Sequence, residues 1–169
     1  MDLYFLRHGE AGKRVPMAAK DTERALTAAG RQEVEQAAKG IAELDYKFDL
    51  VVTSPLKRAK DTALIVNKAL GRKAPVEEWP ELKPESGRNA FYQRLAKLGP
   101  SSVVLCVGHE PYLTTAIGEI TGRGRDTSPG FRISLKKSGL AKLSVTGFNP
   151  RITGELRWLL TPRQLRKLA

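Results

Sequence analysis

The chain has 169 residues, of which 41% are hydrophobic and 28% are charged. This length and balance suit one compact domain over residues 1–169 with a sizeable hydrophobic core, and they exclude a disordered chain. With 29 Lys and Arg against 18 Asp and Glu, the formal net charge of +11 favours anionic partners: phosphorylated molecules, acidic proteins, nucleic acid or an anionic membrane. Charge alone does not choose among them.

The cysteine count and the short apolar runs indicate the cellular compartment in which the protein is found. Cys106 is the only cysteine, so no disulfide forms within the chain and a reducing environment is expected. It lies in an apolar run and is expected to be a buried, inert thiol. The apolar run Leu3–Leu6 is too short for a signal peptide, and no stretch approaches the roughly 20 apolar residues of a membrane helix. We therefore expect a cytoplasmic protein without a membrane partner.

The first part of the chain predicts a strand, a loop and a helix. Leu3–Leu6 is a run of large apolar residues typical of a buried strand, and it ends at the polar segment Arg7–Glu10. Residues 11–26 are mixed and polar, which indicates a surface loop. Thr27 is the expected N-cap of a following helix of about 17 residues, whose apolar positions recur with helical spacing.

A second strand and helix follow. Leu50–Thr53 predicts a strand, and Ser54 and Pro55 are the expected N-cap and first residue of the next helix. Gly71 is the expected end of that helix. Residues 72–89 are rich in Pro and Glu and are expected to form a loop, with a short strand near Val76.

The alternation of strands and helices continues in the middle of the chain. A helix is expected around residues 88–98, followed by a third buried strand at Val103–Val107. The apolar spacing over residues 113–120 predicts another helix. The basic, Gly-rich segment Gly122–Gly130 is expected to be a loop.

The last part of the chain predicts antiparallel strands. Phe131–Leu135 and Leu140–Val145, joined at Lys136–Gly139, are interpreted as a hairpin, and Glu155–Leu160 as a final strand. Together with the earlier alternation of strands and helices, this predicts a three-layer α/β/α sandwich. Its central sheet should be largely parallel, with the late hairpin adding antiparallel strands.

The two histidines of the sequence stand directly after predicted strands. Ligands of such sheets bind at the carboxyl ends of the strands, so His8 and His109 are expected to emerge at the same edge. Arg58 falls about one turn into the helix that follows the second strand. Helical side chains lean toward the N-terminus, which should return its guanidinium to that edge.

The residues expected at this edge are Arg7, His8, Arg58 and His109, joined by Arg24 from the preceding loop. Guanidiniums and imidazoles without clustered carboxylates or thiols make a poor metal site. They make a good site for a phosphoryl group, because the planar fork of arginine matches phosphate oxygens and fixed positive charge stabilises the transferring group.

Several short motifs occur in a fixed order along the chain. They are Arg-His-Gly in Arg7–Glu10, then Leu26–Gly30, Ser54–Ala59 and Gly108–His109. In these motifs and their order the sequence resembles the histidine phosphatase superfamily, also called phosphoglycerate mutase-like. The short length and the segments Arg24–Thr27 and Pro80–Pro84 most resemble the phosphohistidine phosphatases of the SixA type.

The resemblance implies a mechanism without metal or organic cofactor. A neutral His8 would attack phosphorus, and water would then hydrolyse the phosphohistidine that forms. Arg7, Arg58 and His109 would hold the phosphoryl oxygens, with Arg24 as a helper. An ester leaving group also needs a proton, for which Glu81 and Glu110 are the candidates. A phosphohistidine substrate needs less help, because its leaving imidazole is protonated near pH 6.5.

Three functions remain open at this stage. The leading hypothesis is hydrolysis of phosphohistidine in a protein by a monomeric enzyme. The second is a small-molecule phosphomonoesterase of the same superfamily; a phosphoglycerate mutase is disfavoured by the short chain. The third is a non-catalytic basic binding protein. Nucleic-acid binding is not expected, because the sequence lacks an aromatic RNA-binding motif and a helix-turn-helix pattern.

Overall fold

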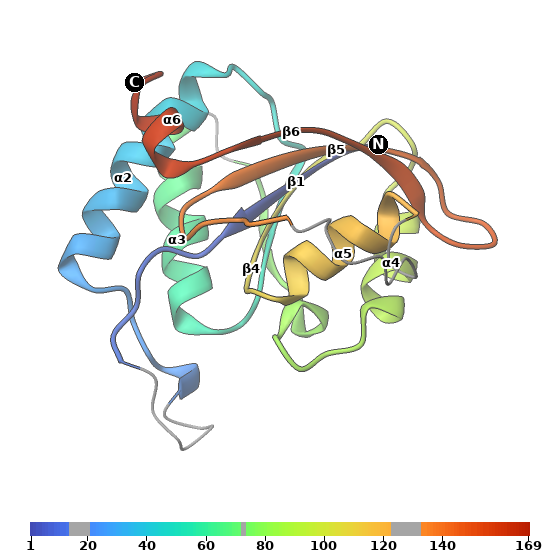
Figure 1. Cartoon of the computed structure of the whole chain (residues 1–169), viewed down its shortest axis with the longest axis horizontal. Coiled ribbons are helices and arrows are strands. Elements are labelled where there is room, and N and C mark those ends of the chain that lie inside the picture. Colours follow the sequence, from blue (N-terminus) through green and yellow to red (C-terminus); the bar gives the residue numbers. More distant parts are fainter. Residues whose placement is uncertain (14–20, 72–73, 123–132) are drawn as a thin grey trace.

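The computed structural model describes residues 1–13, 21–71, 74–122 and 133–169 (Figure 1). Its elements in chain order are β1 (Asp2–Arg7), α2 (Ala28–Glu43), β2 (Leu50–Thr53), α3 (Lys57–Ala69), β3 (Val76–Glu78), the 3₁₀ helix η1 (Pro80–Leu82), α4 (Arg88–Ala96), β4 (Val103–Gly108), α5 (Tyr112–Ile120), β5 (Leu140–Gly147), β6 (Thr153–Leu160) and α6 (Pro162–Arg166). Within these described ranges, no helix combines the length and the apolar character needed to cross a membrane.

The strands form one sheet of six in the order β3-β2-β4-β1-β5-β6. The four strands from β3 to β1 are parallel, whereas β5 runs antiparallel to both β1 and β6. This arrangement confirms the predicted α/β architecture, with a largely parallel sheet and a late antiparallel pair.

The side chains of the central strand β1 point alternately to the two faces of the sheet, so the core lies in two layers. In β1, Leu3 and Phe5 face the side covered by α4 and α5. Tyr4 and Leu6 face the opposite side, which α2, α3 and α6 cover. Figure 1 shows these two groups of helices on either side of the sheet. Because the central strand is buried on both faces, its residues are apolar without interruption up to the polar segment that follows.

The thiol predicted to be inert lies in the neighbouring central strand, β4. Cys106 is fully buried among core residues, and burial raises the pKa of its thiol well above its ordinary value. A thiol held in the neutral form is a poor nucleophile, so Cys106 serves as a core side chain.

The start of α2 is the one predicted from the sequence, whereas the start of α3 is not. The hydroxyl of Thr27 accepts the N–H of Gly30 at 2.9 Å, which is the predicted N-cap. In contrast, α3 begins at Lys57, so the expectation that Ser54 and Pro55 start this helix is wrong. The reason is that the Ser54 hydroxyl contacts His109 at 2.8 Å, and the chain bends before the helix begins.

The predicted late hairpin has different strands in the structure. Residues 133–135 form no strand, and 131–132 lie outside the described residues. Instead, β5 pairs with β6, so Glu155–Leu160 supplies the partner strand. The physical reason is that β1 and β6 occupy both sides of β5, which leaves no place beside β5 for a strand at residues 133–135.

One glycine of α2 is packed directly against the segment that follows β1. A Cβ added to Gly30 would clash with the backbone carbonyl of Glu10. We therefore expect Gly30→Ala to lower the free energy of unfolding by about 1–3 kcal/mol, because neither backbone has room to move. Urea unfolding measures this change in the free energy of unfolding. The control is Gly87→Ala, whose new methyl group meets open space; a change of less than about 1 kcal/mol is expected there. Equal effects of the two substitutions would contradict the packing argument.

Candidate active site

The ends of three parallel strands bring the predicted residues together. Arg7 of β1 is paired with Gly108 of β4, so His8 and His109 each follow one member of this pair. The N–H of His8 donates to the carbonyl of Gly108 at 3.1 Å, and the two imidazole rings lie 5.0 Å apart between centroids. Ser54, at the end of β2, donates its N–H to Val107 at 3.0 Å, which places it at the same edge.

The first imidazole is buried, oriented and neutral. The side chain of His8 has its Nδ1 2.7 Å from the carbonyl of Gly9. A carbonyl only accepts, so Nδ1 carries the proton and Nε2 holds the free lone pair. Burial, followed by the positive charges of Arg58 and Arg7, lowers the pKa of His8 to about 3 despite the bond to Gly9. At neutral pH its Nε2 is therefore unprotonated, and its lone pair is free.

The second imidazole is also buried and neutral. His109 has 2% of its surface exposed, and its Nε2 lies 2.8 Å from the hydroxyl of Ser54. Burial first, and then the neighbouring His8 and Arg58, lowers the pKa of His109 to about 2. Its Nδ1 is buried and has no hydrogen-bond partner among the described residues. A buried polar atom without a partner needs an explanation, and contact with a bound ligand is one such explanation.

Two arginines of the site are held by one aspartate. The guanidinium of Arg58 donates to the backbone carbonyl of Asp21 at 2.9 Å and lies 3.3 Å from its carboxylate. The Nε of Arg24 lies 2.9 Å from the same carboxylate, and its Nη1 donates to Gly12 at 2.8 Å. Both guanidiniums contribute to the low pKa values of the histidines. The structure thus brings Arg24 and Arg58 into the group predicted from sequence.

The last arginine is positioned by the C-terminal half of the chain. The Nη1 of Arg7 donates to the carbonyl of Leu135 at 3.0 Å. Its backbone N–H donates to Gly139 at 3.1 Å, and its carbonyl accepts the N–H of Ser138 at 3.0 Å. The segment that was expected to join two strands therefore holds the end of β1 in place.

Helix α3 is tied to the backbone beside the first histidine. The hydroxyl of Thr62 donates to the carbonyl of Arg58 at 2.7 Å and accepts the N–H of Gly9 at 3.1 Å. Thr62, Asp21 and Ser54 are site residues that the sequence reasoning missed. Thr62 had a signal, since it stands four residues after Arg58 and so on the same helix face. Ser54 had one too, since it directly follows a predicted strand and opens the motif Ser54–Ala59.

The two carboxylates considered as proton donors have different surroundings. Glu110 directly follows His109 and is half-buried; one carboxylate oxygen accepts from Thr114, and the other is buried without a hydrogen-bond partner in the described part. Burial raises the pKa of Glu110, although Thr114 and Arg7 oppose the shift. In contrast, the carboxylate of Glu81 lies 3.2 Å from the guanidinium of Arg94 on α4. The structure therefore favours Glu110 over Glu81 as a proton donor at this edge.

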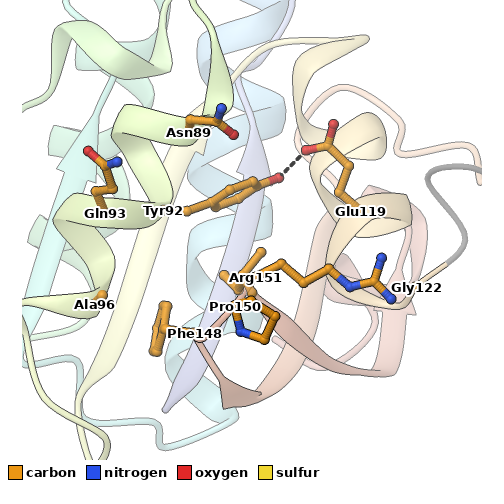
Figure 2. Close-up of a pocket in the computed structure, with 10 residues that line it drawn as sticks. Asn89, Tyr92, Gln93, Ala96, Glu119, Gly122, Phe148, Pro150 and Arg151 are labelled. Atoms are coloured by element: carbon orange, nitrogen blue, oxygen red, sulfur yellow. Dashed lines mark hydrogen bonds between the residues drawn. The ribbon is translucent and has the colours of Figure 1, made fainter.

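A separate pocket of about 590 Å³ lies at the far end of α5 (Figure 2). Figure 2 shows Tyr92 of α4 pointing toward Glu119 of α5, to which its hydroxyl donates at 2.6 Å. Phe148 and Arg151 line the pocket from the connection between β5 and β6. None of the predicted site residues lines it, so the strand-end group and this pocket are different places.

The strand-end group can hold a tetrahedral anion beside a nucleophile. It combines the guanidiniums of Arg7, Arg24 and Arg58 with two neutral imidazoles. In the described ranges, no group of three or more His, Cys, Asp or Glu side chains could hold a metal ion. Guanidiniums match the oxygens of a phosphoryl group, and a neutral imidazole nitrogen can attack phosphorus.

Comparison with known proteins identifies the family of this site. The family model of the histidine phosphatase superfamily (branch 1) matches residues 3–84. The phosphohistidine phosphatase SixA of Escherichia coli (strain K12) is 30% identical over 169 residues, covering 98% of this chain and 97% of SixA. The chain belongs to the histidine phosphatase superfamily, in its SixA-type branch. It is accordingly a phosphatase that acts on phosphorylated substrates.

Other relatives extend the similarity to the whole chain. An uncharacterized protein of Picosynechococcus sp. (strain ATCC 27264 / PCC 7002 / PR-6) is 32% identical over 170 residues, covering 98% of this chain and 99% of that protein. A solved structure of the protein histidine phosphatase SixA complexed with tungstate has a TM-score of 0.80 at 23% identity, covering 98% and 99% of the two chains. The similarity in fold to that SixA structure thus includes α4 to α6, which lie beyond the matched residues 3–84.

The low pKa values of the histidines make the stability of this phosphatase depend on pH. Below about pH 6.5 the unfolded chain protonates both histidines, whereas the folded chain keeps them neutral, because the folded pKa values are about 3 for His8 and about 2 for His109. The unfolded state then binds more protons. We expect the free energy of unfolding to fall with decreasing pH, by up to about 1.4 kcal/mol per pH unit for each histidine.

Urea unfolding between about pH 7.5 and about pH 5 measures this slope. The control is the double variant His8→Asn/His109→Asn, which keeps the carboxylates that also titrate at acid pH. Its slope should be clearly smaller than that of the wild type. Equal slopes would show that the two imidazoles accept protons in the folded protein.

Proposed function

We propose that this phosphatase hydrolyses phosphohistidine in proteins through a covalent intermediate on His8. The observation that carries the proposal is the buried, neutral His8, whose Nδ1 is bound to the carbonyl of Gly9 so that Nε2 keeps a free lone pair. Arg7 and Arg58 act on this imidazole as positive charges. Such charges would stabilise the phosphoryl group while it is transferred.

In the first step, Nε2 of His8 attacks phosphorus in line with the leaving group. A P–N bond to His8 forms, and the P–N bond of the substrate breaks. The electron pair of the broken bond stays on the leaving imidazole, which takes up a proton. Guanidiniums of Arg7 and Arg58 and the Nδ1 of His109 would hold the phosphoryl oxygens, with Arg24 adding positive charge.

In the second step, water attacks the phosphorus of the intermediate. The P–N bond to His8 breaks, its electron pair returns to Nε2, and inorganic phosphate leaves with the oxygen and one proton of the water. The second proton of the water passes to solvent and replaces the proton that the leaving imidazole took up in the first step. The bond from Nδ1 to the carbonyl of Gly9 keeps the imidazole in the same orientation throughout. Each of the two displacements has a lower barrier than a single direct displacement by water would have.

The leaving group supports a phosphohistidine substrate. Imidazole has an ordinary pKa of about 6.5, so it is protonated readily and departs without a strong acid in the site. The 30% identity to the phosphohistidine phosphatase SixA of Escherichia coli supports the same substrate class. A cytoplasmic location, a monomeric state and independence from cofactors remain predictions from the sequence.

One observation favours a second candidate function, the hydrolysis of small phosphate esters. An alkoxide leaving group needs a proton donor, and the raised pKa of Glu110 suits that role. Glu110 also directly follows His109, which places a carboxyl group at the phosphoryl edge. The two candidates share the nucleophile and differ in their dependence on this acid.

The nucleophile is tested by phosphate release from a phosphohistidine protein and from a panel of phosphate esters, in the presence of EDTA. We expect His8→Ala to lower the rate by at least about 10³-fold, because no other nucleophile replaces Nε2. Arg58→Ala should lower it by about 10²-fold. The matched control is Arg157→Ala, an exposed arginine paired with Glu155 at 2.9 Å, which should change the rate by less than about twofold.

The intermediate itself is tested by rapid quenching with a radiolabelled substrate. Label should appear on the wild type and not on His8→Ala. Undiminished release by His8→Ala would contradict the assigned nucleophile. No release from any substrate by the wild type would overturn the catalytic proposal and favour the third hypothesis, a basic binding protein. Loss of activity with EDTA would contradict independence from metal.

The proton donor is tested by Glu110→Gln with both substrate classes. We expect kcat/KM for a phosphate ester to fall by about 10²-fold, because the alkoxide loses its acid, whereas phosphohistidine turnover should change by less than about threefold. The matched control is Glu81→Gln, whose carboxylate is paired with Arg94; it should affect neither substrate strongly. A larger effect of Glu81→Gln would assign the acid to Glu81 instead.

A further inference from the structure

Ser54 contacts the second imidazole of the site from the end of β2. Its side chain is fully buried, and its hydroxyl oxygen lies 2.8 Å from Nε2 of His109. The same oxygen accepts the backbone N–H of Leu56 at 3.4 Å. The hydroxyl is therefore enclosed between one N–H donor and one imidazole nitrogen.

The direction of the bond to His109 follows from counting protons. A hydroxyl has one proton to donate and two lone pairs to accept with. Leu56 occupies one lone pair, so the proton needs an acceptor, and among the described residues Nε2 of His109 lies within reach. If Nε2 carried a proton instead, the hydroxyl proton of Ser54 and the lone pair of Nδ1 would both be buried without a partner. If Nε2 accepts, only the N–H at Nδ1 is left without one in the absence of a ligand, which costs less.

The other ring nitrogen of His109 then carries the proton. The imidazole is neutral at physiological pH, so only one of its nitrogens is protonated. With Nε2 accepting from Ser54, that nitrogen is Nδ1, which is buried and has no partner within the described residues. An N–H donor at this position is what a phosphoryl oxygen needs, whereas a lone pair there would repel it.

We propose that Ser54 is a positioning residue that fixes the Nδ1–H tautomer of His109 by donating its hydroxyl proton to Nε2. This rests on the proposed function, in which the Nδ1–H of His109 holds an oxygen of the transferring phosphoryl group. Ser54 itself does not touch the substrate. It acts by keeping the proton on the nitrogen that faces the ligand, as outer hydrogen bonds do for other oriented histidines.

The tautomer is measured directly by long-range ¹H–¹⁵N spectra of ¹⁵N-histidine-labelled protein near neutral pH. The sequence contains two histidines, so the His8→Asn variant assigns both rings. We expect His109 of the wild type to show a protonated Nδ1 and an unprotonated Nε2. In Ser54→Ala this preference should be lost, giving a mixture of tautomers or the Nε2–H form.

The activity of the same variants supplies the second readout. Ser54→Ala should lower kcat/KM and weaken inhibition by inorganic phosphate, each by about tenfold, the effect of one lost hydrogen bond. Ser54→Thr keeps the hydroxyl and should retain the Nδ1–H tautomer. The matched control is Thr53→Val, because the Thr53 hydroxyl is buried next to Ser54 and donates to the backbone carbonyl of Ser54 at 3.1 Å, not to the imidazole. It should change neither the tautomer nor the affinity for phosphate.

The spectra separate this proposal from the proposed function. An Nε2–H tautomer in the wild type, or an unchanged Nδ1–H tautomer in Ser54→Ala, would overturn the role of Ser54 even if the enzyme is active. Conversely, an inactive wild type with the expected tautomers would overturn the proposed function and leave the proton assignment standing. A loss of the tautomer in Thr53→Val as well would show a general disturbance of the strand end, which also contradicts a specific role of Ser54.

Discussion

The parallel pairing of β1 with β4 is the constraint on which the site depends. Because Arg7 is paired with Gly108, the residues that follow, His8 and His109, leave the sheet side by side with ring centroids 5.0 Å apart. A shift of one residue in this register would turn one of the imidazoles to the opposite face. The apolar residues of both strands prevent such a shift, since they fill the two core layers in strict alternation.

Burial and positive charge together lower the pKa values of the two imidazoles. Both effects disfavour protonation, and burial is the larger in each case. The result is a cationic site whose two histidines stay neutral, which a nitrogen nucleophile requires. The guanidiniums that create this field are themselves held by protein groups: Asp21 holds Arg24 and Arg58, and the carbonyl of Leu135 holds Arg7. These guanidiniums would move little when an anion binds. Charges that are already in position are the usual source of electrostatic catalysis.

Residues distant in sequence complete the site through backbone groups. The carbonyls of Gly9, Leu135 and Gly139 orient His8 and Arg7, although any residue could supply such a carbonyl. This explains why the C-terminal half matters to a site whose signature lies near the N-terminus. It also explains why 133–135 form no strand, since this segment ends at the carbonyl that holds Arg7 and the sheet positions beside β5 are taken.

The sequence by itself determined the fold class and the family. It also predicted that Arg7, His8, Arg58 and His109 lie at one edge of the sheet, because each stands directly after a strong strand or within a motif. It could not choose between Glu81 and Glu110, since ion pairing and burial depend on which elements pack together. It also placed the start of α3 and the late hairpin wrongly, because local patterns do not show which hydroxyl an imidazole needs or which sheet positions are free. The contact between Ser54 and His109, the anchoring of Arg24 and Arg58 by Asp21 and the bonds to backbone carbonyls arise only when segments distant in the sequence meet, so tertiary structure alone decided them.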